Sequence, residues 1–487
     1  MSLAFIPLYI KFLGIEAYGI IGIFTSLVAI FSLFDMGMGA TLNRETARLS
    51  AQPDGAQRIR DLARTLELIY WLLAGLIAVV VFFMAPLISG FWIKPQALSV
   101  VTITDAFAFM GLAIAFQFPF SLYAGGMAGL QKHVSLNLLT ATMATLRFGG
   151  AAMVLWLVEP TILAFFSWQI LVGALQSFMA AMLLWRRLPK SECAARFNGA
   201  LLRQVWRFAA GVTGISILGV VLAQMDKIVL SKLLTLEMFG YYSLASVVAS
   251  GLYVIISPVF TAIFPRFSQL IAHRDEEDVK QLYHQSAQLL SVLLLPIAWV
   301  LAAFSREILL LWTADPIVAD KAHALVSLLV IGTAINGLIH VPYALQLGYG
   351  WTRFGLYQNL VSILLLPPLL IVMTKWYGPE GAAITWIALN VGYLLIGQQI
   401  MHSRFLRGEK WRWYISDVFS PFMGVFLMAS AISWWDSWDV REHIKGSLIW
   451  MLVLYGLLLL TAVLFAPHIR KQLSGIMKYL IGKPHAS

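Results

Sequence analysis

The chain has 487 residues, of which 60% are hydrophobic and 12% charged, and its mean hydropathy is +0.80. Water-soluble domains cannot bury this much apolar surface, so the composition excludes a soluble enzyme or binding module and predicts a membrane protein. The formal net charge is +10, but most of the 34 Lys and Arg fall in alternate loops on one side of the predicted membrane. The basic charge therefore indicates topology and predicts no nucleic-acid partner.

Apolar runs of the length that a bilayer requires, about 20 residues, recur along the whole chain. A first, short run at 1–13 predicts an incomplete helix. The runs that follow lie at 17–40, 66–91, 106–130, 138–158, 161–185, 209–233, 241–264, 289–311, 324–349, 357–376, 381–401, 418–435 and 446–466. They show no two-residue alternation, which disfavours barrel strands. The predicted fold class is an all-α polytopic membrane protein with about fourteen transmembrane helices.

The loops predict the orientation of the chain. The basic polar segment 43–64 is expected to lie along the membrane surface as a helix, and a second basic segment, 186–208, is a linker. The positive-inside rule places both segments and both termini in the cytoplasm. Because Cys193 is the single cysteine, no intrachain disulfide and no cysteine-rich metal site is expected. The histidines have no metal-ligand spacing and no phosphate-binding loop occurs, so we predict no metal and no cofactor.

A repeat organises the chain. The pattern L-x-x-E-x-[YF]-G occurs at 13–19 and again at 234–240, and weaker matches keep an offset of about 220 residues over six helices. Because six is even, the two halves enter the membrane from the same side, which predicts a pseudo-twofold axis along the membrane normal. We expect an N-terminal lobe at 1–195 and a C-terminal lobe at 196–402. The segment 403–487 is an appended helix pair, joined by an outer tryptophan-rich loop at 434–445, with a basic tail.

Three motifs carry a resemblance to a known family. The stretch FIPLYIKFLGIEAYG fits P-x-x-x-[KR]-x-L-G-x-E-x-[YF]-G, the stretch FDMGMG at 34–39 is followed by Arg44, and the predicted seventh helix contains Q-x-D at 224–226. In these features, over roughly 1–402, the chain resembles the Wzx-type polysaccharide flippases. They belong to the multidrug, oligosaccharidyl-lipid and polysaccharide exporter superfamily.

The resemblance implies a V-shaped pair of six-helix lobes around a cavity that opens alternately inward and outward. It implies a polyprenyl-diphosphate-linked oligosaccharide as cargo, moved from the cytoplasmic to the periplasmic leaflet of a bacterial inner membrane. The implied partners are membrane lipids, a coupling ion such as Na⁺ or H⁺, a polysaccharide polymerase and glycosyltransferases. No catalytic residue is expected, because this activity is transport.

Cationic residues at or near membrane depth are the candidate substrate-binding residues. Arg147 is the first, since a guanidinium can hold a diphosphate with two parallel hydrogen bonds; the alternative is that it reaches the headgroups or neutralises a carboxylate. Arg44 and Arg266, near the cytoplasmic ends of equivalent helices, are predicted to gather an anionic headgroup, with ordinary loop charge as the alternative. Lys11 is expected at the outer end of the first helix, to receive the diphosphate after the switch, with topology as the alternative. Lys227 is the last candidate, with snorkelling or pairing as its alternative.

Two acidic residues are candidates for ion coupling. Asp226 lies deep in the seventh predicted helix next to Lys227, and side chains adjacent in a helix point about 100° apart. It is expected to bind a cation or proton, or alternatively to form an inter-helix salt bridge. Asp35 lies near the cytoplasmic end of the second predicted helix, where a bond to the glycine-rich backbone or to an Arg of the other lobe is the alternative role.

Helix-breaking residues recur at related positions of the two halves. Gly37 aligns with Pro258, and Pro119 lies close to the counterpart of Pro342. Interrupted helices at corresponding positions indicate the site or hinge of a repeat transporter, so these four residues are the predicted hinges.

Three functions remain open on the sequence. The first is the flippase. The second is a cation-coupled multidrug exporter of the same fold, which the mixed charge of Arg147, Lys227 and Asp226 disfavours. The third is a membrane polysaccharide polymerase or ligase, which the short outer loops disfavour.

Overall fold

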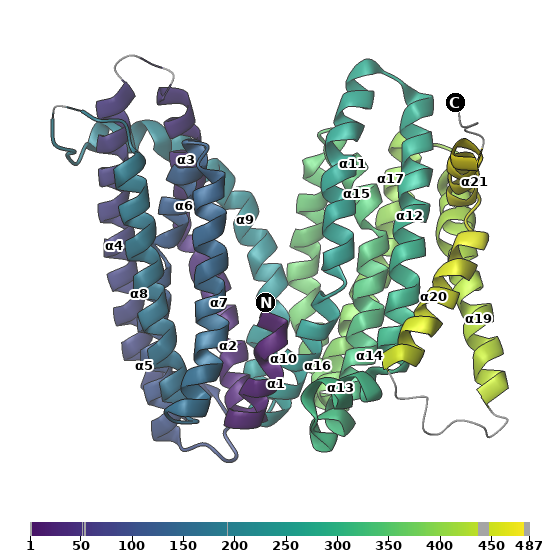
Figure 1. Cartoon of the computed structure of the whole chain (residues 1–487), viewed down its shortest axis with the longest axis horizontal. Helices are drawn as coiled ribbons and strands as arrows, with labels where there is room; N and C mark the ends of the chain where they lie inside the picture. Colours follow the sequence, from purple (N-terminus) through teal and green to yellow (C-terminus); the bar gives the residue numbers. More distant parts are fainter. Residues whose placement is uncertain (1, 51, 53–54, 192, 437–447, 482–487) are drawn as a thin grey trace, which may run out of the picture. The chain divides into compact units, whose positions relative to one another are not determined.

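The computed structural model describes residues 2–50, 52, 55–191, 193–436 and 448–481. All regular structure in these residues is helical, as predicted (Figure 1). The chain divides into two compact units, residues 1–240 and 241–487. The predicted boundary between the lobes lies at 195/196, whereas the two units divide at 240/241. The assignment of residues 196–240 to the C-terminal lobe stays a prediction.

The first unit begins with a short helix, α1, and continues mostly with longer helices. Its elements are α1 (Ser2–Leu13), α2 (Ile15–Phe31), the 3₁₀ helix η1 (Ser32–Asp35), α3 (Met38–Leu49), α4 (Gly55–Leu87), the π-helix η2 (Ile88–Trp92), α5 (Val100–Gln117), α6 (Phe120–Gly129), α7 (His133–Leu157), α8 (Ile162–Arg187) and α9 (Gly199–Leu233). The division between the units falls inside α10 (Leu236–Ser250).

The second unit repeats this order and adds a C-terminal extension. Its elements are α11 (Tyr253–His273), α12 (Glu276–Ala303), α13 (Ser305–Thr313), α14 (Pro316–Leu338), α15 (His340–Gly348), α16 (Thr352–Gly392), the π-helix η3 (Tyr393–Gly397), α17 (Gln398–Phe405), α18 (Lys410–Arg412), the π-helix η4 (Trp413–Phe419), α19 (Ser420–Asp436), α20 (Leu448–Leu464) and α21 (Pro467–Ile481).

Among the described residues, ten helices are long and apolar enough to cross a membrane, or up to eleven if the bent pair α20–α21 counts as one. The chain is a multi-pass membrane protein, whereas the predicted number of about fourteen helices is not confirmed. Two predicted spans, 357–376 and 381–401, lie in one continuous run of helical residues whose first element is α16. Gly378 inside it has φ 61° and ψ −147°, a conformation open almost only to glycine, and so marks the break between them.

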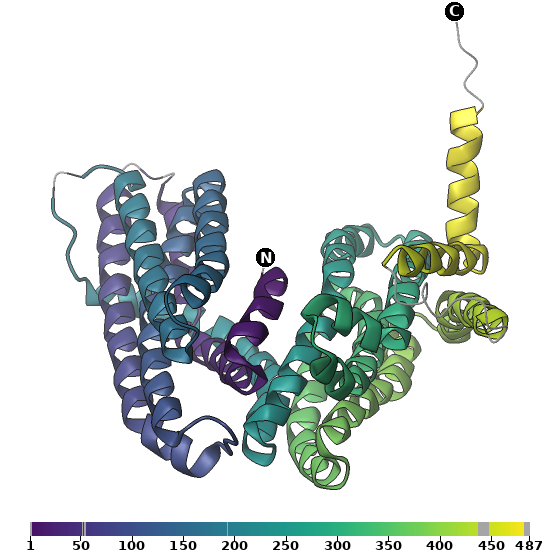
Figure 2. The same cartoon turned by 60° about the horizontal axis from the view of Figure 1, so that its bottom comes forward.

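The internal repeat is visible in the packing of each unit. In the first unit α5 packs between α4 and α8, and α3 packs on α6 (Figures 1 and 2). In the second unit α14 packs between α12 and α16, and α11 packs on α15. The starts of α4 and α12 are 221 residues apart, and those of α6 and α15 are 220 apart. The offset read from the sequence therefore relates equivalent helices of the two units.

The repeated glycine of the motif sits at a close helix crossing in the first unit. A Cβ atom on Gly19 would lie 2.6 Å from the carbonyl oxygen of Leu236, and one on Gly240 would lie 2.3 Å from that of Ile15. Both distances are shorter than any van der Waals contact, so only glycine fits at either position. The two copies of the motif thus pack on each other through the same residue.

Glu16, the glutamate of the first motif, connects this crossing to the loop before α5 by hydrogen bonds. The buried carboxylate of Glu16 accepts hydrogen bonds from the backbone N–H groups of Gln96 at 2.6 Å, Ala97 at 2.8 Å and Leu98 at 3.3 Å. The N–H groups of this non-helical loop have no helical partners. Glu16 supplies the acceptors that this loop lacks.

One expectation about helix boundaries is wrong. The segment 43–64 is not one surface helix, because it divides between the end of α3 and the first turns of α4. The sequence Gln-Pro-Asp-Gly at 52–55 explains the division, since proline removes a backbone donor and glycine weakens a helix interior. The predicted run 106–130 lies, apart from its last residue, within one candidate membrane span, Val100–Gly129, in which α5 ends at Gln117 and α6 begins at Phe120.

The C-terminal extension is joined to the second unit by an apolar core. Val425 of α19 and Leu454 and Leu458 of α20 are buried together with Val292 and Val300 of α12. Helices α19 and α20 also pack on each other. The predicted outer loop between them lies mostly outside the described residues.

Candidate functional site

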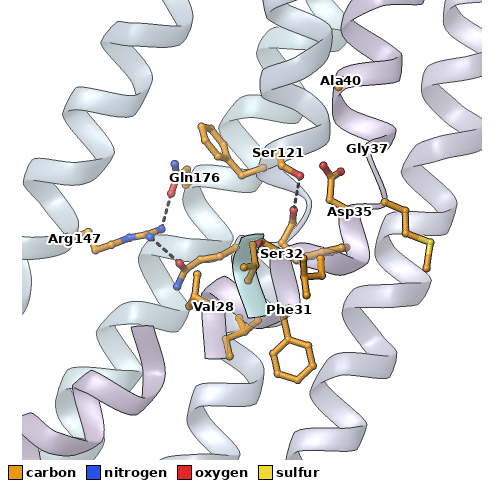
Figure 3. Close-up of a pocket in the computed structure, with 16 residues that line it drawn as sticks. Val28, Phe31, Ser32, Asp35, Gly37, Ala40, Ser121, Arg147 and Gln176 are labelled. Carbon is orange, nitrogen blue, oxygen red and sulfur yellow. Dashed lines mark hydrogen bonds between the residues drawn. The ribbon is translucent and has the colours of Figure 1, made fainter. Parts of the chain in front are cut away.

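The first unit contains a cavity of about 610 Å³ that brings charged and polar side chains together inside the helix bundle (Figure 3). Its walls come from the α2–η1–α3 interruption, from the α5–α6 interruption, and from α7, α8 and α9. The lining residues are Val28, Phe31, Ser32, Leu33, Asp35, Met36, Gly37, Ala40, Ile114, Gln117, Phe118, Phe120, Ser121, Arg147, Gln176 and Val220. Both helix interruptions of this unit therefore face one cavity.

The first interruption carries the acidic residue of the site. After η1 the backbone passes through left-handed conformations at Met36 (φ 46°) and Gly37 (φ 69°) before α3 begins. Glycine adopts this conformation without penalty, whereas for Met36 it costs about 1–3 kcal/mol. The Oδ1 atom of Asp35 accepts a hydrogen bond from the N–H of Gly39 at 3.1 Å. This bond supplies one of the acceptors that the first turn of α3 needs, and the positive end of the helix favours the carboxylate.

The second interruption presents polar groups from the end of α5 and the start of α6. Pro119 has no N–H and follows the last residues of α5, so the α-helical ladder stops there. Gln117 is the last residue of α5, and the hydroxyl of Ser121 donates to the carbonyl of Phe118 at 3.3 Å. A Cβ atom on Gly125 would meet the carbonyl of Gly39 at 2.2 Å, so α3 and α6 approach too closely for any larger residue.

Arg147 lies within α7 and lines the cavity, where its guanidinium donates to two side-chain amides. Its Nη1 donates to Oε1 of Gln117 at 2.7 Å, and its Nη2 donates to Oε1 of Gln176 at 2.5 Å (Figure 3). Gln176 belongs to α8 and is 8% exposed. The guanidinium is therefore held from two neighbouring helices, α5 and α8, by neutral oxygens.

The positive charge of Arg147 has no ion-pair partner in the part of the chain that the structure describes. Among the described side chains no carboxylate pairs with it, although Asp35 lines the same cavity. The side chain lies at a cavity of the bundle and bonds two amides, and the roles weighed for Arg147 stay predictions. A guanidinium whose hydrogen-bond acceptors are neutral amides keeps a charge that can bind an anion.

The remaining predicted cations lie elsewhere. Lys11, Arg44 and Arg266 are exposed and outside the cavity. Arg44 lies 3.9 Å from Glu45, and Arg266 donates to Gln269 at 3.3 Å. The roles given to these three residues stay predictions.

The adjacent pair in α9 is separated from the Arg147 cavity as well. Lys227 lines a smaller cavity of about 310 Å³ with Ile23, Trp92 and Phe239 among its neighbours. Asp226 is half-buried and does not line either cavity. Ion coupling at Asp226 and substrate binding at Lys227 also stay predictions.

The four predicted hinge residues lie at or near helix interruptions. Gly37 precedes α3 directly, and Pro119 precedes α6 directly. In the second unit α14 gives way to α15 at Ile339, three residues before Pro342. Pro258 lies inside α11, which starts at Tyr253 after the end of α10 at Ser250. A hinge role for these residues stays a prediction.

The sequence reasoning missed the two glutamines. Gln117 and Gln176 each stand alone in an apolar run, AIAFQFPF and VGALQSFM. A polar amide within a membrane helix usually faces a partner, and this signal could have identified them. No sequence pattern, however, indicated that both would meet Arg147.

A family profile described as "Polysaccharide biosynthesis protein" matches residues 10–315, a range that includes every polar residue of the cavity. The match covers more than half of the chain. The chain belongs to the polysaccharide biosynthesis protein family. This membership confirms the resemblance that the motifs predicted.

Relatives of this family member have low sequence identity. A putative O-antigen transporter of Shigella flexneri is 20% identical over 374 residues, which cover 77% of this chain and 87% of the relative. An inward-facing multidrug resistance transporter of the MATE family and the MOP superfamily has a TM-score of 0.64 and 14% identity, covering 82% of this chain and 94% of that one. The lipid II flippase MurJ in its inward closed conformation has a TM-score of 0.62 and 11% identity, covering 96% and 98%.

These similarities confirm the predicted fold class. All three proteins are named as transporters or as a flippase, in agreement with the prediction that this family member is not an enzyme.

Proposed function

We propose that the chain is a flippase for polyprenyl-diphosphate-linked oligosaccharides in surface polysaccharide assembly. By alternating access, it moves the lipid-linked sugar from the cytoplasmic to the periplasmic leaflet of the bacterial inner membrane. Both termini are cytoplasmic in this proposal. The cargo is supplied by glycosyltransferases and consumed by a polymerase.

The unneutralised charge of Arg147 carries the proposal. A diphosphate headgroup that crosses the membrane interior must exchange water for a compensating cation, because burying its charges alone costs far more than any binding energy. The guanidinium of Arg147 lines a cavity large enough for such a group, and two amides hold it in place. Family membership and the O-antigen transporter support the same class of cargo.

Asp35 supplies the ion-coupling part of the proposal. Its carboxylate lines the cavity that also contains Arg147. A cation or proton bound there would change the charge that the substrate meets, so that the two cavity states bind the substrate differently. Such a difference is what an ion gradient needs to drive the switch.

A cation-coupled multidrug exporter is the second candidate, because Asp35 makes the cavity partly acidic and the fold is also that of a MATE-family transporter. Efflux of a cationic dye from cells that express the chain separates the two functions. A flippase is expected to give no efflux, whereas an exporter gives efflux that the Asp35→Asn variant loses. A polymerase, the third candidate, is distinguished by the deletion experiment below.

Deletion of the gene in its host tests the flippase directly. We expect surface polysaccharide to be lost and lipid-linked repeat units to accumulate on the cytoplasmic face of the inner membrane. Accumulation on the periplasmic face would contradict the proposal and favour a polymerase. Complementation by Arg147→Ala is expected to fail, while Arg147→Lys retains part of the activity. Arg58→Ala, which removes an exposed arginine outside the cavity, is the matched control and should complement fully.

A further inference from the structure

Arg147 is half-buried, and the two groups that hold it are unusual partners for an arginine inside a helix bundle. A buried guanidinium is ordinarily paired with a carboxylate. Here both acceptors are amide oxygens, Oε1 of Gln117 and Oε1 of Gln176. We propose that these two glutamines are specificity-determining positioning residues, which fix the direction of the guanidinium while leaving its full charge for a diphosphate. This inference rests on the proposed function and assigns two residues to its substrate site.

The positions of the two amides are fixed by packing. Gln117 lies against α8, because a Cβ atom on Gly173 would come within 3.0 Å of Cγ of Gln117. One residue after Gln176, the hydroxyl of Ser177 donates to the carbonyl of Phe116 at 2.5 Å. These contacts hold α5 against α8 next to the two amides. The amides therefore act as a rigid fork that sets the orientation of Arg147 before a ligand arrives.

Charge explains why amides rather than carboxylates occupy these positions. A glutamate has the size of a glutamine and an oxygen at the same place, so it could accept the same hydrogen bond from Arg147. It would also cancel the positive charge, and a phosphate would then meet a neutral pair. Selection for stability alone would thus tolerate glutamate at either position, whereas anion binding excludes it.

At the equivalent crossing of the second unit, between α14 and α16, side-chain amides form hydrogen bonds without an arginine. There Asn336 of α14 donates to Asn390 of α16 at 2.7 Å, and Tyr253 donates to Asn336 at 2.9 Å. Asn390 in turn donates to the carbonyl of Trp386 at 2.8 Å. These amides bond one another and the backbone, and no cation lies among them in the described part of that unit. The arginine-directed amides are therefore a feature of the first unit.

Gln176→Glu is the most direct test, measured on the full-length protein in lipid nanodiscs. The probes are inorganic diphosphate and farnesyl diphosphate, with inorganic monophosphate as the reference ligand. We expect Gln176→Glu to unfold at the wild-type temperature or above, because a carboxylate beside Arg147 is paired. We expect its affinity for both diphosphates to fall at least about tenfold, which corresponds to about 1.4 kcal/mol, and complementation to be lost.

The matched control is Gln169→Glu, which places a carboxylate at a buried glutamine of the same helix. Gln169 is 2% exposed and does not line the cavity. An unpaired carboxylate there should lower the unfolding temperature. The contrast separates a carboxylate that pairs with Arg147 from one that is merely buried.

The outcomes distinguish this inference from the proposed function. If Gln176→Glu binds diphosphate and complements like the wild type while Arg147→Ala does neither, the role of the amides is overturned and the flippase stands. If Arg147→Ala complements and the wild type binds no diphosphate, the proposed function itself is wrong. If both Gln176→Glu and Gln117→Glu fail to fold, no carboxylate pairs with Arg147 and the inference is overturned as well.

Discussion

At the scale of single residues, the site depends on the hydrogen-bond partners of its charged side chains. Arg147 was predicted as a site residue from its position in an apolar helix; the structure places it at a cavity, and its role stays a prediction. Its partners Gln117 and Gln176 were not predicted, because the meeting of α5, α7 and α8 is a tertiary arrangement without a local pattern. Asp35 and a bond from it to the glycine-rich backbone were weighed from the sequence, but its place in the same cavity as Arg147 became apparent only in the structure.

Substitutions of Asp35 separate its two roles. Asp35→Asn keeps an oxygen that can accept from Gly39, so the free energy of unfolding should change by less than about 0.5 kcal/mol. Asp35→Ala removes the acceptor and should lower it by about 1 kcal/mol, as for other helix caps. If Asp35 binds the coupling cation, both variants lose transport driven by an ion gradient. Thermal unfolding together with gradient-driven uptake in vesicles measures the two effects; full uptake by Asp35→Asn would remove Asp35 from the coupling role.

At the scale of elements, the sequence predicted which segments are helical better than where each helix stops. Apolar runs and the 220-residue offset identified the helices and their repetition. The division of 43–64, and the join of 357–376 to 381–401 across Gly378, depend on a few turn residues. Such residues change the direction of the chain without changing the hydropathy of a window, so a periodicity argument does not detect them.

The repeated glycines should be intolerant of any side chain. Gly19→Ala and Gly240→Ala each force a methyl group against a backbone oxygen, at 2.6 and 2.3 Å. Because backbone cannot yield as a side chain can, we expect each variant to lower the free energy of unfolding by about 2 kcal/mol. Gly75→Ala in α4 is the control, since no atom lies within 4 Å of its added methyl group. Alanine there should be neutral or stabilise by up to about 1 kcal/mol, as measured by thermal unfolding in one detergent.

The carboxylate of Glu16 is a second element-scale prediction. Glu16→Gln leaves one amide oxygen where two carboxylate oxygens accepted from three N–H groups. We expect a loss of about 2 kcal/mol in the free energy of unfolding, because hydrogen bonds to a charged acceptor are replaced by fewer bonds to a neutral one. Hydrogen exchange at Gln96, Ala97 and Leu98 should become faster in the variant. Unchanged exchange at these amides would show that the loop before α5 is held by other contacts.

At the scale of the whole molecule, the C-terminal extension is less separate than the repeat suggests. Segment 403–487 has no counterpart in the first half, yet a buried network joins it to α12. His284 bonds Asp417 through Nδ1 and Glu409 through Nε2, the latter at 3.1 Å. Gln288 donates to Asp417 at 2.9 Å. The extension therefore supplies acceptors that buried polar groups of the second unit require.

Asp417 tests this integration. It is fully buried, so Asp417→Ala removes the acceptor of His284 Nδ1 and the nearest acceptor of Gln288 and should lower the free energy of unfolding by about 3 kcal/mol. Asp320→Ala is the control, because Asp320 forms an exposed pair with Arg306 and such pairs contribute at most about 1 kcal/mol. Chemical unfolding monitored by tryptophan fluorescence compares the two variants. Equal losses would contradict a structural role for the network.

The central claim is that Arg147 carries the diphosphate of a lipid-linked oligosaccharide through the membrane. The most direct measurement is translocation of a polyprenyl-diphosphate-linked oligosaccharide in proteoliposomes, followed by access of an added enzyme to the sugar on the opposite leaflet. The account predicts translocation by the wild type, at least tenfold slower translocation by Arg147→Ala, which corresponds to about 1.4 kcal/mol, and wild-type rates for Arg58→Ala. Equal rates for Arg147→Ala and the wild type would contradict it.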